Sequence, residues 1–465
     1  MEQSLKQNKM GTMPVPRLIL SLGVPMMLSM VGQALYNMVD TFFVSRIADT
    51  PQVAHMGDKA INALTLAYPV QMLIIALMVG IGIATNTMLA RSLGKKDRER
   101  ASIVAGNAMT IGLGCFIVIF LFGLFAAKAF IGSQTQDPLV AEMGTTYLRI
   151  VTVFSFGAIG YMCLEKVAMG CGNTKATMIG QLAGAVTNII LDPILIFGML
   201  GLPAMGVTGA AIATVAGQFV SLFIIAYVVF FRTKELDRGL RFLRPRKDVM
   251  GQFLHISLPA ITQQILAPIM SYGMNLILGA ISATAITAYG VYYKLQYFIM
   301  MAAYGLNNAS ISSTAYNLGA KQKSRIYQIL RFTLLLITAV MLVGVIVLQI
   351  FTRPIVGIFS ISEEATQLCV LAVHIISLGF FFNAANTILQ GICQALGSGL
   401  SSLTVTLLRF LVVPLPLACI FALTSIADKL VWAAIPIAEA AGFVVAVLLT
   451  RRLYIKKVAV LPDQI

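Results

Sequence analysis

Charged side chains are scarce in this chain. Of its 465 residues, only 11% are Asp, Glu, Lys or Arg, whereas 58% are hydrophobic and the mean hydropathy is +0.88. Soluble globular proteins carry about 25% charged residues. The chain therefore has too few polar groups to cover a water-facing surface, and we expect lipid to be its main solvent.

Motifs that carry enzymatic chemistry are also missing. The six cysteines form no C-x-x-C pair, the three histidines are far apart, and no GxxxxGK[ST] phosphate loop occurs. These absences argue against a disulfide framework, a metal-ligand cluster and the direct use of ATP. We expect neither enzyme activity nor a cofactor. A membrane-embedded enzyme is the more distant alternative, because it would need a nucleophile–base pair or a metal cluster near a bilayer surface.

The chain has instead a series of long apolar runs. A helix that crosses the apolar core of a bilayer needs about 20 consecutive apolar residues. Twelve stretches qualify, near residues 17–45, 60–90, 101–126, 144–164, 176–198, 206–231, 250–279, 285–317, 326–351, 366–394, 400–424 and 430–450. Closed β-barrels show short alternating segments, so these runs predict an all-α integral membrane protein with twelve transmembrane helices.

The basic residues are distributed unevenly between these spans. With the N-terminus placed inside, 25 of the 33 Lys and Arg residues fall in inner segments and five in outer loops. This bias predicts a multi-pass protein of the cell membrane with both termini in the cytoplasm. It also accounts for the net charge of +15, so we expect no nucleic-acid partner. The basic loop 232–247 is expected to touch anionic lipid.

The two halves of the chain are related. LGKKDRERA (93–101) matches LGAKQKSRI (318–326), and GCGNT (170–174) matches ALGSG (395–399) at the same offset. Pro25 and Pro259 occupy similar places near the start of each half. We therefore predict an N-terminal lobe, 1–235, with spans one to six, and a C-terminal lobe, 236–465, with spans seven to twelve. Two six-helix bundles related by a pseudo-two-fold axis along the membrane normal are a plan typical of transporters.

Three acidic residues fall well inside spans: Asp40, Asp192 and Glu439. Such residues are costly in lipid and by default mark a path for an ion or a substrate. Asp40 lies six residues before Arg46 and Asp192 six before Gly198. With a rise of about 1.5 Å per residue, each carboxylate lies about 9 Å from the outer end of its helix. Equal depth predicts one shared site for a proton or a sodium ion.

Asn188 belongs to the same predicted site. It lies four residues before Asp192 and so shares its helix face. Two carboxylates close together in a low dielectric cannot both stay charged without a cation. Pro193 removes a backbone hydrogen bond beside Asp192, so the helix is expected to bend there. The repeat places Met274 and Leu417 where the first half has its two aspartates, and we expect the site in the first half only.

Other charged residues within spans receive separate expectations. Lys294, which lies among tyrosines, is expected to line a substrate cavity. Arg409 is expected to extend toward the inner membrane surface, and Glu165 and Lys166 to be solvated at a helix end. For Glu439, a role in the cleft and a structural role both stay open.

Several of these stretches, taken in order, resemble the multidrug and toxic compound extrusion (MATE) family over essentially the whole chain. They are Pro25, YNMVDTFFV (36–44), LGKKDRERA (93–101), GCGNTKATMIGQ (170–181), NIILDPILIFG (188–198), MGVTGAAIAT (205–214), GVYYKLQ (290–296) and YNLGAKQK (316–323). The resemblance implies a V-shaped pair of six-helix bundles and a secondary active antiporter linked to antibiotic resistance. Such a protein exports organic cations and drugs by alternating access, in exchange for sodium ions or protons.

The prokaryotic branch with DinF-type and MepA-type members offers the best match. Its cation site implies coupling residues at Asp40, Asn188, Asp192 and Thr214, which is also a possible sodium site. The resemblance further implies helix bending at Pro25 and Pro193. A substrate cavity is expected along span one, at Met30, Gln33, Tyr36 and Asn37, together with Lys294.

A lipid-linked saccharide flippase of the same wider superfamily is the nearer alternative. Such a protein would be expected to carry a more cationic cavity for pyrophosphate, and here only Lys294 and Arg409 are candidates. The sequence leaves open which drugs are exported, which ion couples to export, and whether Glu439 and Lys294 are functional. We expect a monomer surrounded by membrane lipids.

Overall fold

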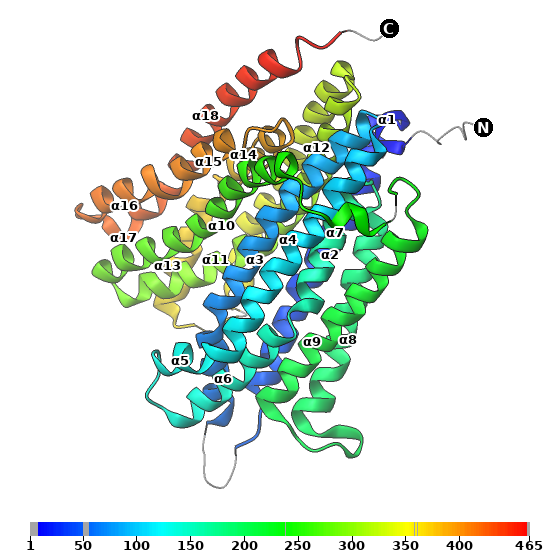
Figure 1. Ribbon diagram of the computed structural model, residues 1–465. Helices are drawn as coiled ribbons and strands as arrows, with labels where there is room; N and C mark the ends of the chain where they lie inside the picture. The colour runs from blue at the N-terminus through cyan, green and yellow to red at the C-terminus, as the bar shows by residue number, and fades with distance from the viewer. Residues whose placement is uncertain (1–7, 50–54, 238, 358, 360, 463–465) are drawn as a thin grey trace. The chain divides into compact units, whose positions relative to one another are not determined.

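The computed structural model describes residues 8–49, 55–237, 239–357, 359 and 361–462 of the chain. These residues form helices and contain no strand, which confirms the all-α class (Figure 1). In chain order the α-helices are α1 (Lys9–Thr12), α2 (Val15–Ser45), α3 (Met56–Gly94), α4 (Arg98–Phe125), α5 (Ala127–Gly132), α6 (Pro138–Val153), α7 (Phe156–Gly170), α8 (Thr174–Phe197), α9 (Gly206–Tyr227), α10 (Lys247–Ile281), α11 (Ala283–Gly319), α12 (Lys323–Gly357), α13 (Glu363–Ser377), α14 (Phe380–Ala395), α15 (Gly399–Leu407), α16 (Pro414–Ala422), α17 (Ala427–Leu430) and α18 (Ala434–Lys457).

Helices long and apolar enough to cross a bilayer account for most of the predicted spans. Nine such helical stretches occur within the described residues. Two further spans are broken helices, because α6 and α7 meet at 44° and α13 and α14 at 49°. The remaining predicted span, 285–317, is α11, which has 37 residues and many polar side chains. With α11, each of the twelve predicted apolar stretches has a helical counterpart.

The chain divides into two compact units. Unit 1 comprises Met1–Met27, Ala90–Lys96 and Leu254–Ile465, and unit 2 comprises Leu28–Leu89 and Asp97–Phe253. The start of α2 belongs to unit 1 because it packs closely on α11. A side-chain carbon at Gly305 would lie 2.6 Å from the backbone nitrogen of Met27, so only glycine permits this approach.

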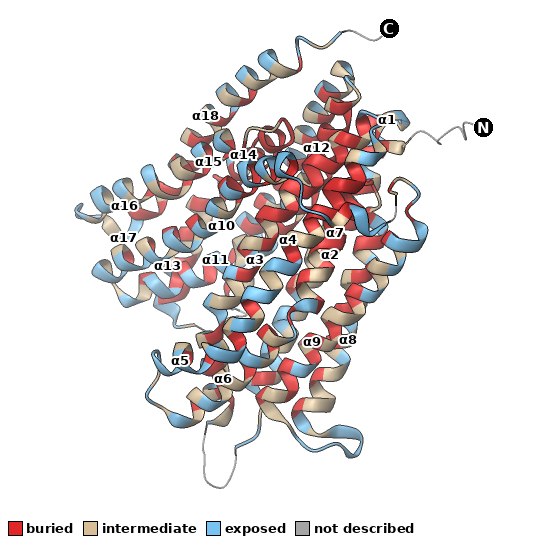
Figure 2. Cartoon of the chain, in the orientation of Figure 1, coloured by how far each residue is buried: buried red, intermediate tan, exposed pale blue. Residues whose placement is uncertain are grey.

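The buried residues lie mainly where one helix contacts another. In each unit, buried residues lie on the faces turned toward neighbouring helices, whereas outer faces carry exposed residues (Figure 2). Many of these exposed residues are large and apolar: on α12 alone Leu335, Val343 and Ile350 are 61%, 62% and 65% exposed. Exposed apolar surface on this scale is typical of helices that face lipid.

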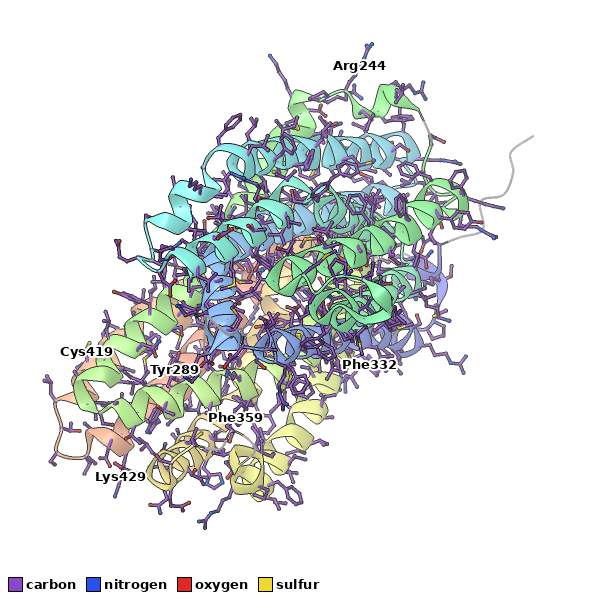
Figure 3. All side chains as sticks on the ribbon, turned by 90° about the horizontal axis from the view of Figure 1, so that it is seen from below. Arg244, Tyr289, Phe332, Phe359, Cys419 and Lys429 are labelled. Carbon is purple, nitrogen blue, oxygen red and sulfur yellow. The ribbon has the colours of Figure 1, made fainter. Side chains whose placement is uncertain are left out.

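The basic loop after α9 is folded onto unit 2. A short 3-10 helix within it, η3 (Leu240–Leu243), lies against α4. The amide nitrogen of Asn107 donates to the carbonyl oxygens of Phe242 and Arg244 at 3.3 and 3.2 Å, and the Asn107 oxygen accepts from the backbone N–H of Arg246 at 2.9 Å. The side chain of Arg244 is exposed (Figure 3).

Candidate functional site

The predicted cation residues are positioned by a close crossing of α8 and α9. Gly184 on α8 and Gly217 on α9 face each other, and a side-chain carbon built on either glycine would lie 2.6 Å from the carbonyl oxygen of the other. Small residues at such a crossing let two membrane helices approach backbone to backbone. Asn188 lies one turn after Gly184, and Thr214 three residues before Gly217, so the crossing brings these two side chains together.

Hydrogen bonds join three of the four predicted coupling residues. The amide nitrogen of Asn188 donates to Asp192 Oδ1 at 3.2 Å and approaches Thr214 Oγ1 at 3.4 Å. Asn188 and Asp192 are 2% and 0% exposed. The spacing of four residues on one helix face predicts the first contact, and the structure confirms it.

Asp40 reaches the same place from α2. Its side chain lies within hydrogen-bonding reach of Asp192. Two ionised carboxylates offer only acceptors, so this contact needs a shared proton or a bound cation. Asp40 Oδ1, Asn188 Oδ1 and Asp192 Oδ2 are all buried and have no hydrogen-bond donor among the described residues.

Sequence reasoning missed the polar groups that surround this cluster. Tyr147 on α6 is 4% exposed and lies close enough to Asp40 and Asp192 to interact electrostatically with them. Its hydroxyl accepts a hydrogen bond from Gln71 at 3.2 Å. Gln218 lies one turn after Thr214 on α9, and its Oε1 is buried without a donor. The position of Gln218 could have been predicted from its spacing to Thr214 on one helix. The contact between Gln71 and Tyr147 could not, because the two residues are 76 positions apart in the sequence.

The residues predicted to line a substrate cavity fall in different units. Met30, Gln33, Tyr36 and Asn37 lie on the part of α2 that belongs to unit 2, and Asn37 is exposed. Lys294 belongs to unit 1, is exposed, and its ammonium group lies 5.8 Å from the centre of the Phe359 ring.

The two prolines predicted to bend helices lie within continuous helices. Pro25 is inside α2 and Pro193 inside α8. The α8 helix ends at Phe197 and is capped by Gly198, whose φ of 74° is the left-handed conformation that favours glycine. Asp192 thus lies near the end of an uninterrupted helix, beside a residue that cannot donate a backbone hydrogen bond.

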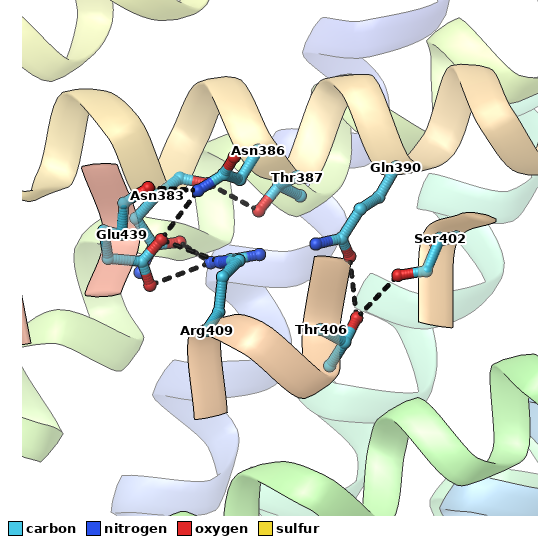
Figure 4. A network of polar contacts seen from close by, with 8 residues as sticks. All are labelled: Asn383, Asn386, Thr387, Gln390, Ser402, Thr406, Arg409 and Glu439. Carbon is cyan, nitrogen blue, oxygen red and sulfur yellow. Dashed lines mark hydrogen bonds and ion pairs between the residues drawn. The ribbon is translucent and has the colours of Figure 1, made fainter. Parts of the chain in front are cut away.

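The expectation for Arg409 is wrong. Arg409 is 4% exposed, and its guanidinium group binds the Glu439 carboxylate through Nε to Oε2 at 2.7 Å and Nη2 to Oε1 at 3.0 Å (Figure 4). Nη2 also donates to Asn383 Oδ1 at 2.9 Å, and Asn386 Nδ2 donates to Glu439 Oε2 at 2.9 Å. The guanidinium group binds the buried acid instead of extending to the membrane surface, because the ion pair neutralises both charges.

The expectation that Glu165 and Lys166 are solvated is also wrong. The two side chains are 9% and 8% exposed and form an ion pair of 3.2 Å. The Lys166 chain packs against Gly82 on α3, where any larger side chain would displace it. The end of α7 is therefore covered by protein, not by water.

A membrane-embedded helical protein with a buried carboxylate cluster and exposed apolar outer faces has the architecture of a membrane transporter. Comparisons with known proteins identify which kind. The model of the MatE family matches residues 25–194 and 259–420, which is more than half of the chain, so the chain belongs to this family. The two matched stretches begin at Pro25 and Pro259, the prolines that the internal repeat pairs.

Individual relatives agree with this assignment. The chain is 27% identical to the multidrug export protein MepA of Staphylococcus saprophyticus over 444 residues, covering 94% of this chain and 95% of that protein. It is 24% identical to the FAD transporter of Shewanella oneidensis, with 88% of each covered. The structure of a multidrug resistance MATE family transporter in an outward-facing conformation matches with a TM-score of 0.89 at 25% identity, covering 98% of this chain and 99% of that chain.

The chain is therefore a membrane transporter of the MATE family and not an enzyme. The family resemblance seen in the sequence is confirmed, and so is the twelve-helix fold in two bundles that the related transporters share.

Proposed function

We propose that the chain is a secondary active antiporter that exports organic cations and drugs in exchange for a monovalent cation, by alternating access. The observation that supports this most directly is the set of three buried oxygens without donors on Asp40, Asn188 and Asp192. Buried polar atoms are nearly always hydrogen-bonded. Three unpaired acceptors within one cluster favour the reversible binding of a cation.

Both candidate coupling ions fit part of this chemistry. The contact between the carboxyl groups of Asp40 and Asp192 suits a shared proton, because a protonated carboxyl can donate to a carboxylate. The set of carboxylate, amide and hydroxyl oxygens, with Thr214 as the hydroxyl, suits a hard cation such as sodium. In either case the bound ion replaces a repulsion between two acids by an attraction, and its release restores that repulsion.

Substrate contacts are proposed along α2. Met30, Gln33, Tyr36 and Asn37 combine a flexible apolar side chain, an aromatic ring and two amides, a mixture that suits varied aromatic cations. They lie on the same helix as Asp40. Bending of α2 at Pro25, or of α8 at Pro193, would then link the substrate-binding face to the state of the proposed cation site, which consists of Asp40, Asn188, Asp192 and Thr214.

The setting of the protein is proposed from its charge distribution. The excess of basic residues in inner segments favours insertion in the cell membrane with both termini in the cytoplasm. The monomer is the proposed functional state, surrounded by membrane lipids.

Reconstitution of the purified chain in liposomes tests this function. A fluorescent cationic dye should move against its gradient when an inward sodium or proton gradient is imposed, and the gradient that works identifies the ion. Asp192→Asn should abolish coupled movement, whereas Asp428→Asn, an exposed acid, should leave it unchanged. Full coupled transport by the Asp192→Asn variant would show that the site is wrongly assigned. Movement of a lipid-linked saccharide in place of the dye would favour the flippase.

A further inference from the structure

Unit 1 contains a cavity that is lined by residues of unit 1 alone. It has a volume of about 70 Å³, enough for a few water molecules or for the head group of a small molecule. Aromatic rings supply much of its wall: Tyr289, Tyr292, Tyr293, Tyr297 and Tyr304 of α11, and Phe410. Tyr289 and Tyr292 are each 2% exposed, whereas Tyr297 is 48% exposed. The cavity thus leads from exposed tyrosines to buried ones.

The acid of the buried ion pair faces this cavity. Glu439 and Asn383 line it, and Arg409 does not. Arg409 is held behind the carboxylate because it extends from a π-helical turn, η4 (Leu408–Val412), and packs against Gly442, where a larger side chain would collide with it. Two hydrogen bonds to Glu439 and one to Asn383 fix its guanidinium group. A molecule in the cavity therefore meets the carboxylate and not the guanidinium group.

The Glu439 carboxylate has room for one more donor. A carboxylate offers about four acceptor positions, two on each oxygen. Among the described residues, Oε2 accepts from Arg409 and from Asn386, whereas Oε1 accepts only from Arg409. One position on Oε1 is left, and a ligand can use it without displacing Arg409.

We propose that this cavity binds the amine head of aromatic substrates that carry a protonated nitrogen with at least one N–H bond. The faces of tyrosine rings attract a positive charge, and the remaining position on Glu439 Oε1 accepts the N–H. A quaternary ammonium ion would be attracted by the tyrosine rings but could not donate a hydrogen bond to Glu439. The subsite therefore discriminates between the two classes of cation. This inference rests on the proposed function, since it refines which cations are carried.

Binding measurements on the purified chain in lipid nanodiscs test the proposal. The ligands are a planar aromatic tertiary amine that is protonated at pH 7 and its N-methylated quaternary analogue. We expect the chain to bind the amine about tenfold more tightly, because a tenfold ratio corresponds to about 1.4 kcal/mol, close to the lower end of what a hydrogen bond to a charged group contributes. Equal affinities for the two ligands would overturn the proposal.

Two variants examine whether the subsite causes this preference. Arg409→Met combined with Glu439→Leu removes both charges at once, so that neither is left buried alone, and should remove the preference. The matched control is Arg353→Met with Glu363→Leu, an exposed pair of 2.8 Å in the same unit, which should keep it. If the first double variant does not fold, Ala267→Phe fills the cavity without altering the pair and should also remove the preference. A preference that survives in either cavity variant would overturn the proposal.

Transport assays separate this proposal from the proposed function. If the unaltered chain shows no ion-driven uptake of either ligand, the antiporter function fails. If uptake is ion-driven but its preference for the amine does not depend on Glu439, only the subsite fails.

Discussion

The buried acidic residues of this protein differ in whether a basic side chain compensates their charge. Within the part of the chain that the structure describes, Asp40 and Asp192 lie together without a basic partner, and one oxygen of each has no donor. Glu439, in contrast, is held by Arg409 and Asn386. In the first arrangement the charge is left for the proposed cation to balance, whereas in the second Arg409 already balances the charge of Glu439. This difference is why we assign ion coupling to the two aspartates and not to Glu439.

The buried pair of Arg409 and Glu439 should behave as a unit in stability measurements. Removing one partner leaves a buried charge uncompensated, so Arg409→Met alone should lower the free energy of unfolding by about 3–5 kcal/mol. Adding Glu439→Leu to it should recover much of that loss. Unfolding in detergent can be followed by the fluorescence of Trp432, the only tryptophan of the chain, which is fully buried in unit 1.

The exposed pair of Arg353 and Glu363 provides the comparison. Its side chains are 73% and 62% exposed, and exposed pairs contribute about 0–1 kcal/mol. Single substitutions there should change little. A double Arg409/Glu439 variant less stable than either single variant would contradict the interpretation of a mutually neutralising pair.

At the scale of elements, the crossing of α8 and α9 determines the geometry of the proposed cation site. Helices that meet at glycines have little freedom to adjust, because backbone contacts backbone. The approach of Asn188 to Thr214 is already long, at 3.4 Å. Any separation of the two helices would therefore break this contact before it disrupted the fold.

Substitution of Gly217 by alanine tests the role of this crossing. The added carbon would lie 2.6 Å from the backbone oxygen of Gly184, so the helices must move apart. We expect ion-coupled dye transport in liposomes to fall about tenfold or more, as small displacements in a coordination site are costly.

Gly114→Ala on α4 is the matched control. A carbon added there meets nothing within 4 Å, and alanine stabilises a helix by about 0.5–1 kcal/mol relative to glycine. This variant should transport normally. Equal losses in the two variants would mean that helix composition, and not the crossing, limits transport.

The start of α6 carries a pH-sensitive contact. Asp137 caps this helix, and Lys59 donates a hydrogen bond of 2.6 Å to its carboxylate. That hydrogen bond, together with those from backbone N–H groups, holds the pKa of Asp137 below its ordinary value of 3.8. A lowered pKa in the folded state means that the contact stabilises the protein above pH 3.8 and that this contribution is lost as the pH falls through the lowered value.

Melting temperatures of the unaltered chain and of Asp137→Asn check this dependence. The unaltered chain should melt higher at neutral pH, and the difference should shrink as the pH falls from 3.8 through the lowered pKa, because the folded state then also takes up a proton at Asp137. In a Lys59→Met background, the difference should be smaller at every pH. A difference that grows toward acid would contradict the assignment.

At the scale of the whole molecule, the sequence predicts what depends on local patterns. Apolar runs indicate the spans, and a spacing of four residues predicts the contact of Asn188 with Asp192. The sequence does not predict contacts that depend on how helices are rotated against each other. Arg409 and Glu439 form such a contact, since they are 30 residues apart and on different helices. Glu165 and Lys166 likewise look like a solvated helix end until the packing of Gly82 against Lys166 is known.

The orientation of the chain in the membrane that its basic residues predict can be tested directly. In a cysteine-free background, Ser133→Cys lies in the exposed turn between α5 and α6, which is predicted to be outside, and Lys95→Cys in an exposed loop predicted to be inside. A membrane-impermeant maleimide should label the first variant in intact cells and the second only after the cells are opened. The reverse pattern would place both termini outside.

The basic loop that joins the two halves of the sequence looks, by composition, like a cleavable linker with several sites for trypsin. Asn107 instead holds its last part on α4 through Phe242, Arg244 and Arg246. A protease must draw several residues of its substrate into an extended conformation, and here that would first break these bonds. The folded protein should therefore resist tryptic cutting after Arg246, whose backbone N–H is held by Asn107, and splitting the chain there to produce separate halves would expose part of unit 2 that the loop covers.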